Sequence, residues 1–182
     1  MAGHSIAGWF SIARAAYHCG MKRLLVLRHA KSSWADTSLD DWQRPLNDRG
    51  RRDAPRVGAW LRERSLVPDL IVTSDAVRAR ETAAAVVAAA GCTCEIVVEP
   101  ALYHATQADA IAVLKSVGNQ AARTILIVGH NPGLEDLVSR LSGEHHHLVT
   151  AALVELAVPV ERWSELDLTI AATLVETWQP SR

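Results

Sequence analysis

The stretch LLVLRHAKSSW, Leu24 to Trp34, decides how this chain folds and where its chemistry lies. Its first four residues are apolar and rich in branched side chains, which is typical of a strand buried on both faces of a sheet. Arg28 and His29 follow this strand directly. Because open α/β sheets bind ligands at the carboxyl ends of their strands, we expect this pair to lie where a ligand binds.

A second segment repeats the pattern of an apolar strand followed by a histidine. The run TILIV at 124–128 leads into GHNPG at 129–133, which contains His130. If the two strands are neighbours in one parallel sheet, about 5 Å apart, the rings of His29 and His130 open into one cleft. The amino end of a helix that begins at Pro132 adds a dipole that favours an anion.

The rest of the chain alternates between strand-like and helix-like segments. This alternation predicts a single-domain α/β fold with a mostly parallel sheet. Further strands are predicted at 69–73 and 94–98, with two more candidates at 151–158 and 166–175. Helices are predicted at 49–64, 108–117 and 132–141, and from a cap at Ser74 and Asp75 to Ala90.

Composition excludes several classes of function. The formal net charge is −1, so no global field points to nucleic acid or to an anionic membrane, and neither is expected as a partner. No apolar run reaches the length of a membrane span. The three cysteines, Cys19, Cys92 and Cys94, do not form a disulfide framework, and we expect the last two to be ordinary thiols. A reducing, cytoplasmic location is therefore expected.

The first twenty residues differ in character from the rest of the chain. They show no clear strand, and Gly8 and Arg14 interrupt the apolar centre that a signal peptide needs. Met21 stands directly before the first strong strand and is a candidate biological start. We therefore expect residues 1–20 to be an extension that is flexible or not native, and residues 21–182 to form the domain.

The residues at the predicted strand ends suit phosphoryl transfer. A neutral histidine can attack phosphorus and become phosphohistidine, and neighbouring cations disfavour the imidazolium form. Arg28 adjoins His29 and can bind phosphate oxygens in a fork. Arg78 follows the strand at 69–73 and reaches the same edge of the sheet. With His130, these residues form a cationic cup for a dianionic phosphoryl group.

The motifs together resemble the histidine phosphatase superfamily. They are LRHA at 27–30, Ser74 with RA at 78–79 and ET at 81–82, and GHNPG at 129–133. RHAKSSW and RPLNDRG, at 28–34 and 44–50, are similar to the SixA phosphohistidine phosphatases within it. The resemblance runs from about Met21 to the end. It implies a three-layer, phosphoglycerate mutase-like sandwich, with a mostly parallel central sheet flanked by helices and with no cofactor or metal.

The resemblance also implies roles for single residues. His29 would be the phosphorylated nucleophile, and Arg28 and Arg78 would hold the phosphoryl oxygens. His130 would donate to the phosphoryl group. Broader relatives carry an asparagine at the position of Ala35, six residues after the first histidine, so a nearby hydroxyl is a candidate substitute in phosphate binding, either Ser32 or Ser33.

The general acid of many relatives is missing. Their glutamate aligns near His104, so no obvious carboxylic acid is in place. Such an acid matters by about 10²–10⁴-fold when a basic alkoxide leaves. Phosphohistidine instead expels an imidazole that can already be protonated. The sequence therefore predicts a metal-independent phosphatase that acts on a phosphohistidine-bearing protein or a small phosphorylated molecule.

Several alternatives stay open on the sequence alone. The chain could be a small-molecule phosphomonoesterase of the same superfamily or a non-catalytic phosphate-binding module. Trp34 and Trp42 either line the mouth of the pocket or cover the sheet edge. The run HHH at 145–147 is expected to be a polar loop rather than a metal site, because no carboxylate or cysteine pattern completes it.

Overall fold

The computed structural model describes residues 20–117 and 121–181. They contain a six-stranded sheet in the order β3-β2-β4-β1-β5-β6. β5 runs antiparallel to both of its neighbours, and the other pairs are parallel, so β6 points the same way as the first four strands. The predicted mostly parallel sheet is confirmed. Its strands are β1 (Lys22–Arg28), β2 (Leu70–Thr73), β3 (Glu95–Val98), β4 (Thr124–Gly129), β5 (Leu153–Val158) and β6 (Thr173–Trp178).

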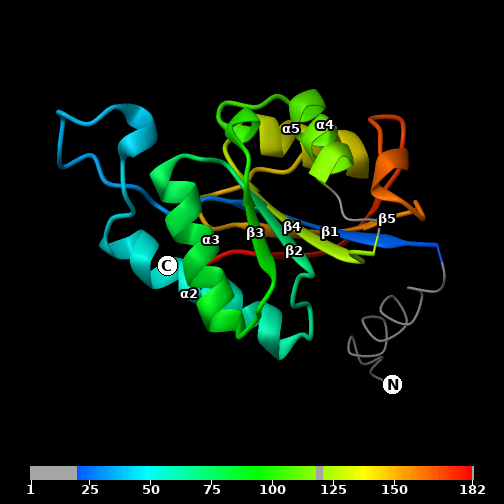
Figure 1. Cartoon of the computed structure of the whole chain (residues 1–182), viewed down its shortest axis with the longest axis horizontal. Helices are drawn as coiled ribbons and strands as arrows, with labels where there is room; N and C mark the ends of the chain where they lie inside the picture. The colour runs from blue at the N-terminus through cyan, green and yellow to red at the C-terminus, as the bar shows by residue number, and fades with distance from the viewer. Residues whose placement is uncertain (1–19, 118–120, 182) are drawn as a thin grey trace, which may run out of the picture.

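Helices cover both faces of the sheet and complete the predicted three layers (Figure 1). Alternate residues of β1 explain why both faces are buried. Leu24 and Val26 belong to one apolar cluster, while Leu25 and Leu27 belong to the other. One cluster is closed by α4 (Gln107–Val117) and α5 (Gly133–Ser142), and the other by α2 (Asp48–Glu63) and α3 (Val77–Ala90).

The close packing of α2 on α3 requires a glycine. A Cβ at Gly58 would collide with the backbone oxygen of Val86 and would lie 2.8 Å from the Cβ of Ala89. Small side chains on α3 therefore allow the two helices to approach, which places the start of α3 beside the carboxyl edge of the sheet. This packing positions Arg78 near the end of β1.

Two of the element starts that differ from the predictions have a local cause in side-chain hydrogen bonds. The helix expected to be capped by Ser74 and Asp75 begins at Val77, with Ala76 as its N-cap. The Ser74 hydroxyl instead accepts a hydrogen bond from the Ala76 amide in a local turn. The last strand does not begin at residue 166. The Asp167 carboxylate accepts from the Thr169 amide at 2.7 Å, which makes a turn, and the strand begins only at residue 173.

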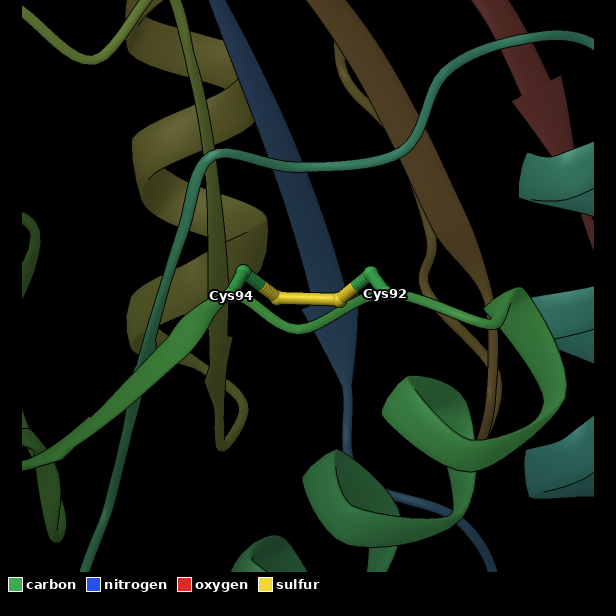
Figure 2. The surroundings of a disulfide bond; sticks show 2 residues. All are labelled: Cys92 and Cys94. Carbon is green, nitrogen blue, oxygen red and sulfur yellow. A yellow bond between two sulfur atoms is a disulfide. The ribbon is translucent and has the colours of Figure 1, made fainter.

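The expectation of two ordinary thiols is wrong in this structure, because Cys92 and Cys94 are joined by a disulfide (Figure 2). Gly91 ends α3 in the left-handed conformation, with φ 67°, and the chain then reverses into β3. This reversal brings the two Cα atoms to 5.5 Å. The bond precedes β3, so it lies at the edge of the sheet opposite the strand ends that carry the histidines.

Most of the predicted extension lies outside the described residues. Within the described residues, no helix has both the length and the apolar character needed to cross a membrane.

Candidate active site

The two histidines lie side by side at the carboxyl edge of the sheet. β1 and β4 pair in parallel with Arg28 opposite Gly129, so the next residue of each strand emerges at the same level. The ring centroids of His29 and His130 are 4.9 Å apart, with planes tilted by 54°. The prediction that neighbouring parallel strands bring these residues together is confirmed. Both are nearly buried, at 8% and 7% exposure.

Arg78 connects the two rings. It comes from the first turn of α3, which follows β2, the other neighbour of β4. Its Nε donates toward Nε2 of His29 at 3.3 Å, and its Nη2 lies 3.4 Å from Nδ1 of His130. The side chain is 4% exposed, so this cation is held against the histidines and away from bulk water.

The partners of His29 define its tautomer. Nδ1 lies 2.7 Å from the carbonyl oxygen of Ala30, which only accepts, so Nδ1 carries the hydrogen and Nε2 a lone pair. Burial lowers the pKa of His29 to about 4; the bond to Ala30 opposes this shift, and the charges of Arg78, Arg28 and Arg44 reinforce it. The ring is therefore neutral near pH 7. Its Nε2 carries the lone pair that nucleophilic attack requires, and Nε of Arg78 faces this lone pair.

His130 is held from its other side. Its Nε2 lies 3.0 Å from the hydroxyl of the buried Ser74. Because the guanidinium of Arg78 only donates, Nδ1 accepts and Nε2 carries the hydrogen, which it donates to Ser74. Burial lowers the pKa of His130 to about 3, and the neighbouring His29 and Arg78 act in the same direction.

Arg28 adds positive charge beside this pair. Its Nη1 donates to the carbonyl oxygen of Leu148 at 2.7 Å, which ties the side chain to the loop after α5. Its Nε is buried and has no hydrogen-bond partner among the described residues. A buried donor without an acceptor is costly, and an anion bound next to it removes that cost.

The two candidate serines serve the loop that carries them. The Ser33 hydroxyl accepts from the Ala35 amide at 3.1 Å. The Ser32 hydroxyl accepts from Nη2 of Arg44 at 2.6 Å. Among the described contacts, neither hydroxyl meets His29 or His130, and a phosphate contact by Ser33 stays a prediction.

Sequence reasoning missed a carboxylate in this site. Asp41 accepts from Nη2 of Arg78 and from the hydroxyl of Tyr103, each at 2.8 Å. It begins the 3-10 helix η1 (Asp41–Gln43), in a loop without periodicity, so no spacing in the sequence announces it. Arg44, in the RPLNDRG motif, forms an ion pair with Asp41, but this contact is visible only in the folded structure.

Other predicted features lie around the site. Trp34 and Trp42 are exposed, at 70% and 46%, on the loop that carries Asp41, and the Arg44 guanidinium carbon lies 3.2 Å from the centre of the Trp34 ring. The histidine run at 145–147 forms a loop. Within the described ranges, no group of three or more histidine, cysteine, aspartate and glutamate residues could hold a metal ion.

Comparisons with known proteins identify the class that this fold and site define. The family described as Histidine phosphatase superfamily (branch 1) matches residues 24–104. An uncharacterized chloroplastic protein of Arabidopsis thaliana is 35% identical over 152 residues, which cover 79% of this chain and 70% of that protein. The chain belongs to the histidine phosphatase superfamily.

Within that superfamily the chain is SixA-like. A SixA protein from Nakamurella multipartitia matches with a TM-score of 0.78 and 26% identity, over 90% of this chain and 98% of that one. The protein histidine phosphatase SixA complexed with tungstate matches with a TM-score of 0.71 and 20% identity, over 85% and 95% of the two chains. The predicted phosphoglycerate mutase-like fold is thereby confirmed.

Proposed function

We propose that this protein is a phosphatase that hydrolyses phosphohistidine through a covalent phosphohistidine intermediate on His29. The observation that carries the proposal is the bridge made by Arg78, whose Nε and Nη2 face Nε2 of His29 and Nδ1 of His130. A tetrahedral anion at this point meets a nucleophilic nitrogen and two donors of one guanidinium at once.

The first half of the reaction transfers the phosphoryl group. Nε2 of His29 attacks phosphorus, and the bond from phosphorus to the substrate nitrogen breaks as the new bond to Nε2 forms. Arg78 and Arg28 offset charge on the phosphoryl oxygens. His130 donates to one of them when its Nδ1 also carries a hydrogen, a state that the charge of the bound phosphoryl dianion favours. The Nδ1 bond to Ala30 stabilises the positive charge that develops on the His29 ring.

The second half regenerates the enzyme. Water attacks phosphorus, the bond to Nε2 of His29 breaks, and inorganic phosphate leaves with the proton lost by the water. The neutral imidazole is restored because its pKa is lowered to about 4. No metal enters either half in this proposal, since the charge of the phosphoryl group is met by arginines.

The leaving group decides the substrate class. Desolvation alone would raise the pKa of the Asp41 carboxyl, but hydrogen bonds from Tyr103, Arg44 and Arg78 outweigh it and lower the pKa to about 2. Asp41 is therefore ionised near pH 7 and cannot protonate an alkoxide. A phosphorylated imidazole leaves without such help, so we favour a phosphohistidine-bearing protein or small molecule as substrate.

The stability of enzyme-bound phosphate in acid and in base tests the proposed phosphohistidine intermediate on His29. Enzyme quenched after exposure to a labelled phosphodonor is expected to carry acid-labile, base-stable label. The His29→Ala variant is expected to carry none, and His145→Ala, changed in an exposed loop, is the matched control. Absence of label on the wild type, or undiminished label on His29→Ala, would overturn the proposal.

A substrate panel tests the finer assignment. Phosphohistidine peptide is expected to be hydrolysed faster than sugar phosphates and nucleotides, with no loss of rate in the presence of a chelator. Faster turnover of a phosphomonoester would reassign the protein to the small-molecule phosphatases. Phosphate binding without turnover of any donor would make it a binding module.

A further inference from the structure

The guanidinium of Arg78 contacts different partners along two of its edges. The edge formed by Nε and Nη2 faces the two histidines. The edge formed by Nη1 and Nη2 is taken by Asp41, which accepts through its backbone oxygen and through Oδ2. A guanidinium offers five N–H donors in one rigid plane, so fixing one edge fixes the direction of the other.

Asp41 is itself held in place from several sides. Tyr103 donates its hydroxyl hydrogen to Oδ2 at 2.8 Å, and Arg44 forms an ion pair with Oδ1. Arg44 is tied to the start of the same loop by donating to the Ser33 carbonyl at 2.9 Å and to the Ser32 hydroxyl at 2.6 Å. The carboxylate cannot turn away from Arg78 without breaking these contacts.

The geometry points to a role for this carboxylate that rests on the proposed function. We propose that Asp41 is a positioning residue, which holds Arg78 so that its Nε–Nη2 edge faces the phosphoryl group on His29. Asp41 does not touch the substrate in this arrangement. It acts by preventing rotation of a long side chain that otherwise has several rotamers, and misplacement of such a donor slows phosphoryl transfer.

A competing role predicts the opposite result. If Asp41 were an internal competitor that the phosphoryl group must displace from Arg78, its removal would strengthen anion binding and raise kcat/KM. The arrangement favours positioning, because Asp41 leaves the edge toward His29 and His130 to other partners. The carboxylate also occupies donors that would otherwise draw Arg78 toward solvent.

Kinetics of Asp41 variants test the proposal. Asp41→Ala is expected to lower kcat by about 10- to 100-fold, with KM changed less than about threefold, because the Arg78 charge remains near the site. Asp41→Asn keeps one amide oxygen for Arg78 and is expected to recover part of the loss. Asp36→Ala is the matched control, since its carboxylate bonds only Ser38, in the same loop, among the residues that the structure describes.

The orientation of the Arg78 guanidinium would not change if Asp41 only stabilised the fold, so this orientation is a second readout of the proposal. Crystals of the wild type with vanadate are expected to show Nε and Nη2 of Arg78 on vanadate oxygens and Asp41 on the other edge. In Asp41→Ala crystals with vanadate, the Arg78 guanidinium is expected to be turned or split between orientations. An unchanged Arg78 in this variant, or loss of the Asp41 contact in the wild type, overturns the proposal.

The outcomes separate this proposal from the proposed function. A wild type that forms the His29 intermediate, together with an Asp41→Ala variant whose kcat stays within twofold or rises, overturns the role of Asp41 alone. A wild type that neither turns over nor becomes labelled overturns the proposed function, and the vanadate structures then decide the role of Asp41. Thermal unfolding of Asp41→Asn beside the wild type separates a loss of folding from a loss of rate.

Discussion

Nε of Arg78 lies 3.3 Å from Nε2 of His29, the ring nitrogen that carries the lone pair. A fixed cation at this point disfavours protonation of the nucleophile and later faces the phosphoryl oxygens that form next to it. Arg78 thus helps to keep His29 neutral in the free enzyme and stabilises the phosphoryl oxygens during the proposed transfer step. Its planar fork matters as much as its charge, because Nη2 reaches His130 and Asp41 at the same time.

The Arg78→Lys variant separates the contribution of the planar guanidinium to kcat from that of its positive charge. A lysine supplies a point charge but cannot face His29, His130 and Asp41 together, so kcat is expected to fall by about 10²-fold or more. Steady-state kinetics with phosphohistidine peptide measure the effect. Arg80→Lys, an exposed position on the same helix, is expected to stay within twofold. Equal rates for Arg78→Lys and the wild type would mean that charge alone is sufficient.

Stability is expected to fall as the pH is lowered from about 6.5 to about 4. The unfolded chain binds protons on both histidines near their ordinary pKa of about 6.5. Burial lowers the folded pKa of His29 to about 4 and of His130 to about 3, so the folded protein stays neutral at both rings in this range. The unfolded state then binds more protons, which favours unfolding as the pH falls.

The size of this effect is bounded by linkage, at roughly 1.4 kcal/mol per pKa unit. The loss is expected to reach at most about 3 kcal/mol for each histidine by pH 4. Denaturant unfolding at several pH values measures it. The double variant His29→Gln, His130→Gln is expected to show a flatter pH dependence in the same range. An equally steep dependence in that variant would assign the proton uptake to other groups.

The hydroxyl of Ser74 is expected to set the orientation of His130. In Ser74→Ala, the Nε2 hydrogen of His130 has no buried acceptor, which costs about 1–3 kcal/mol of stability. A ring free to rotate also lowers kcat, by about 10-fold. Unfolding and kinetic measurements are compared with Ser116→Ala, whose hydroxyl bonds the Val113 carbonyl on α4. If Ser74→Ala lowers kcat no more than Ser116→Ala does, Ser74 does not orient His130.

The fold and the paired histidines could be predicted because both depend on local signals. Apolar runs identify buried strands, and the residue after each run must emerge at the carboxyl edge. The adjacency of β1 and β4 was an assumption, which the parallel pairing confirms. Arg78 could be placed at the same edge because it follows β2, but its role required the family resemblance, because a single arginine near the start of a helix has no distinguishing pattern.

The missed features depend on tertiary contacts or on competing local bonds. Asp41 lies in a loop that only the folded chain brings to Arg78. The last strand begins late because the Asp167 side chain bonds a backbone amide, and such a bond competes with the sheet ladder. The pairing of Cys92 with Cys94 depends on the reversal after Gly91, which the spacing of two residues does not specify.

The approach of α2 to α3 yields a prediction that runs against helix propensity. Alanine is a better helix former than glycine by about 1 kcal/mol, so propensity alone predicts that Gly58→Ala stabilises the protein. The added Cβ would meet the Val86 backbone oxygen, which a rotamer change cannot move away. Overpacking of this kind costs about 1–3 kcal/mol. The net result expected from denaturant unfolding is therefore a loss of stability.

The effect of Gly58→Ala should extend to the site, because α3 carries Arg78 in its first turn. A displaced α3 moves the guanidinium relative to His29, so kcat is expected to fall even where the variant is fully folded. Arg52→Ala, an exposed change on α2, is expected to alter stability by less than about 0.5 kcal/mol and to leave kcat unchanged. A more stable Gly58→Ala variant would show that the two helices can separate without cost, and that their contact does not fix the position of Arg78.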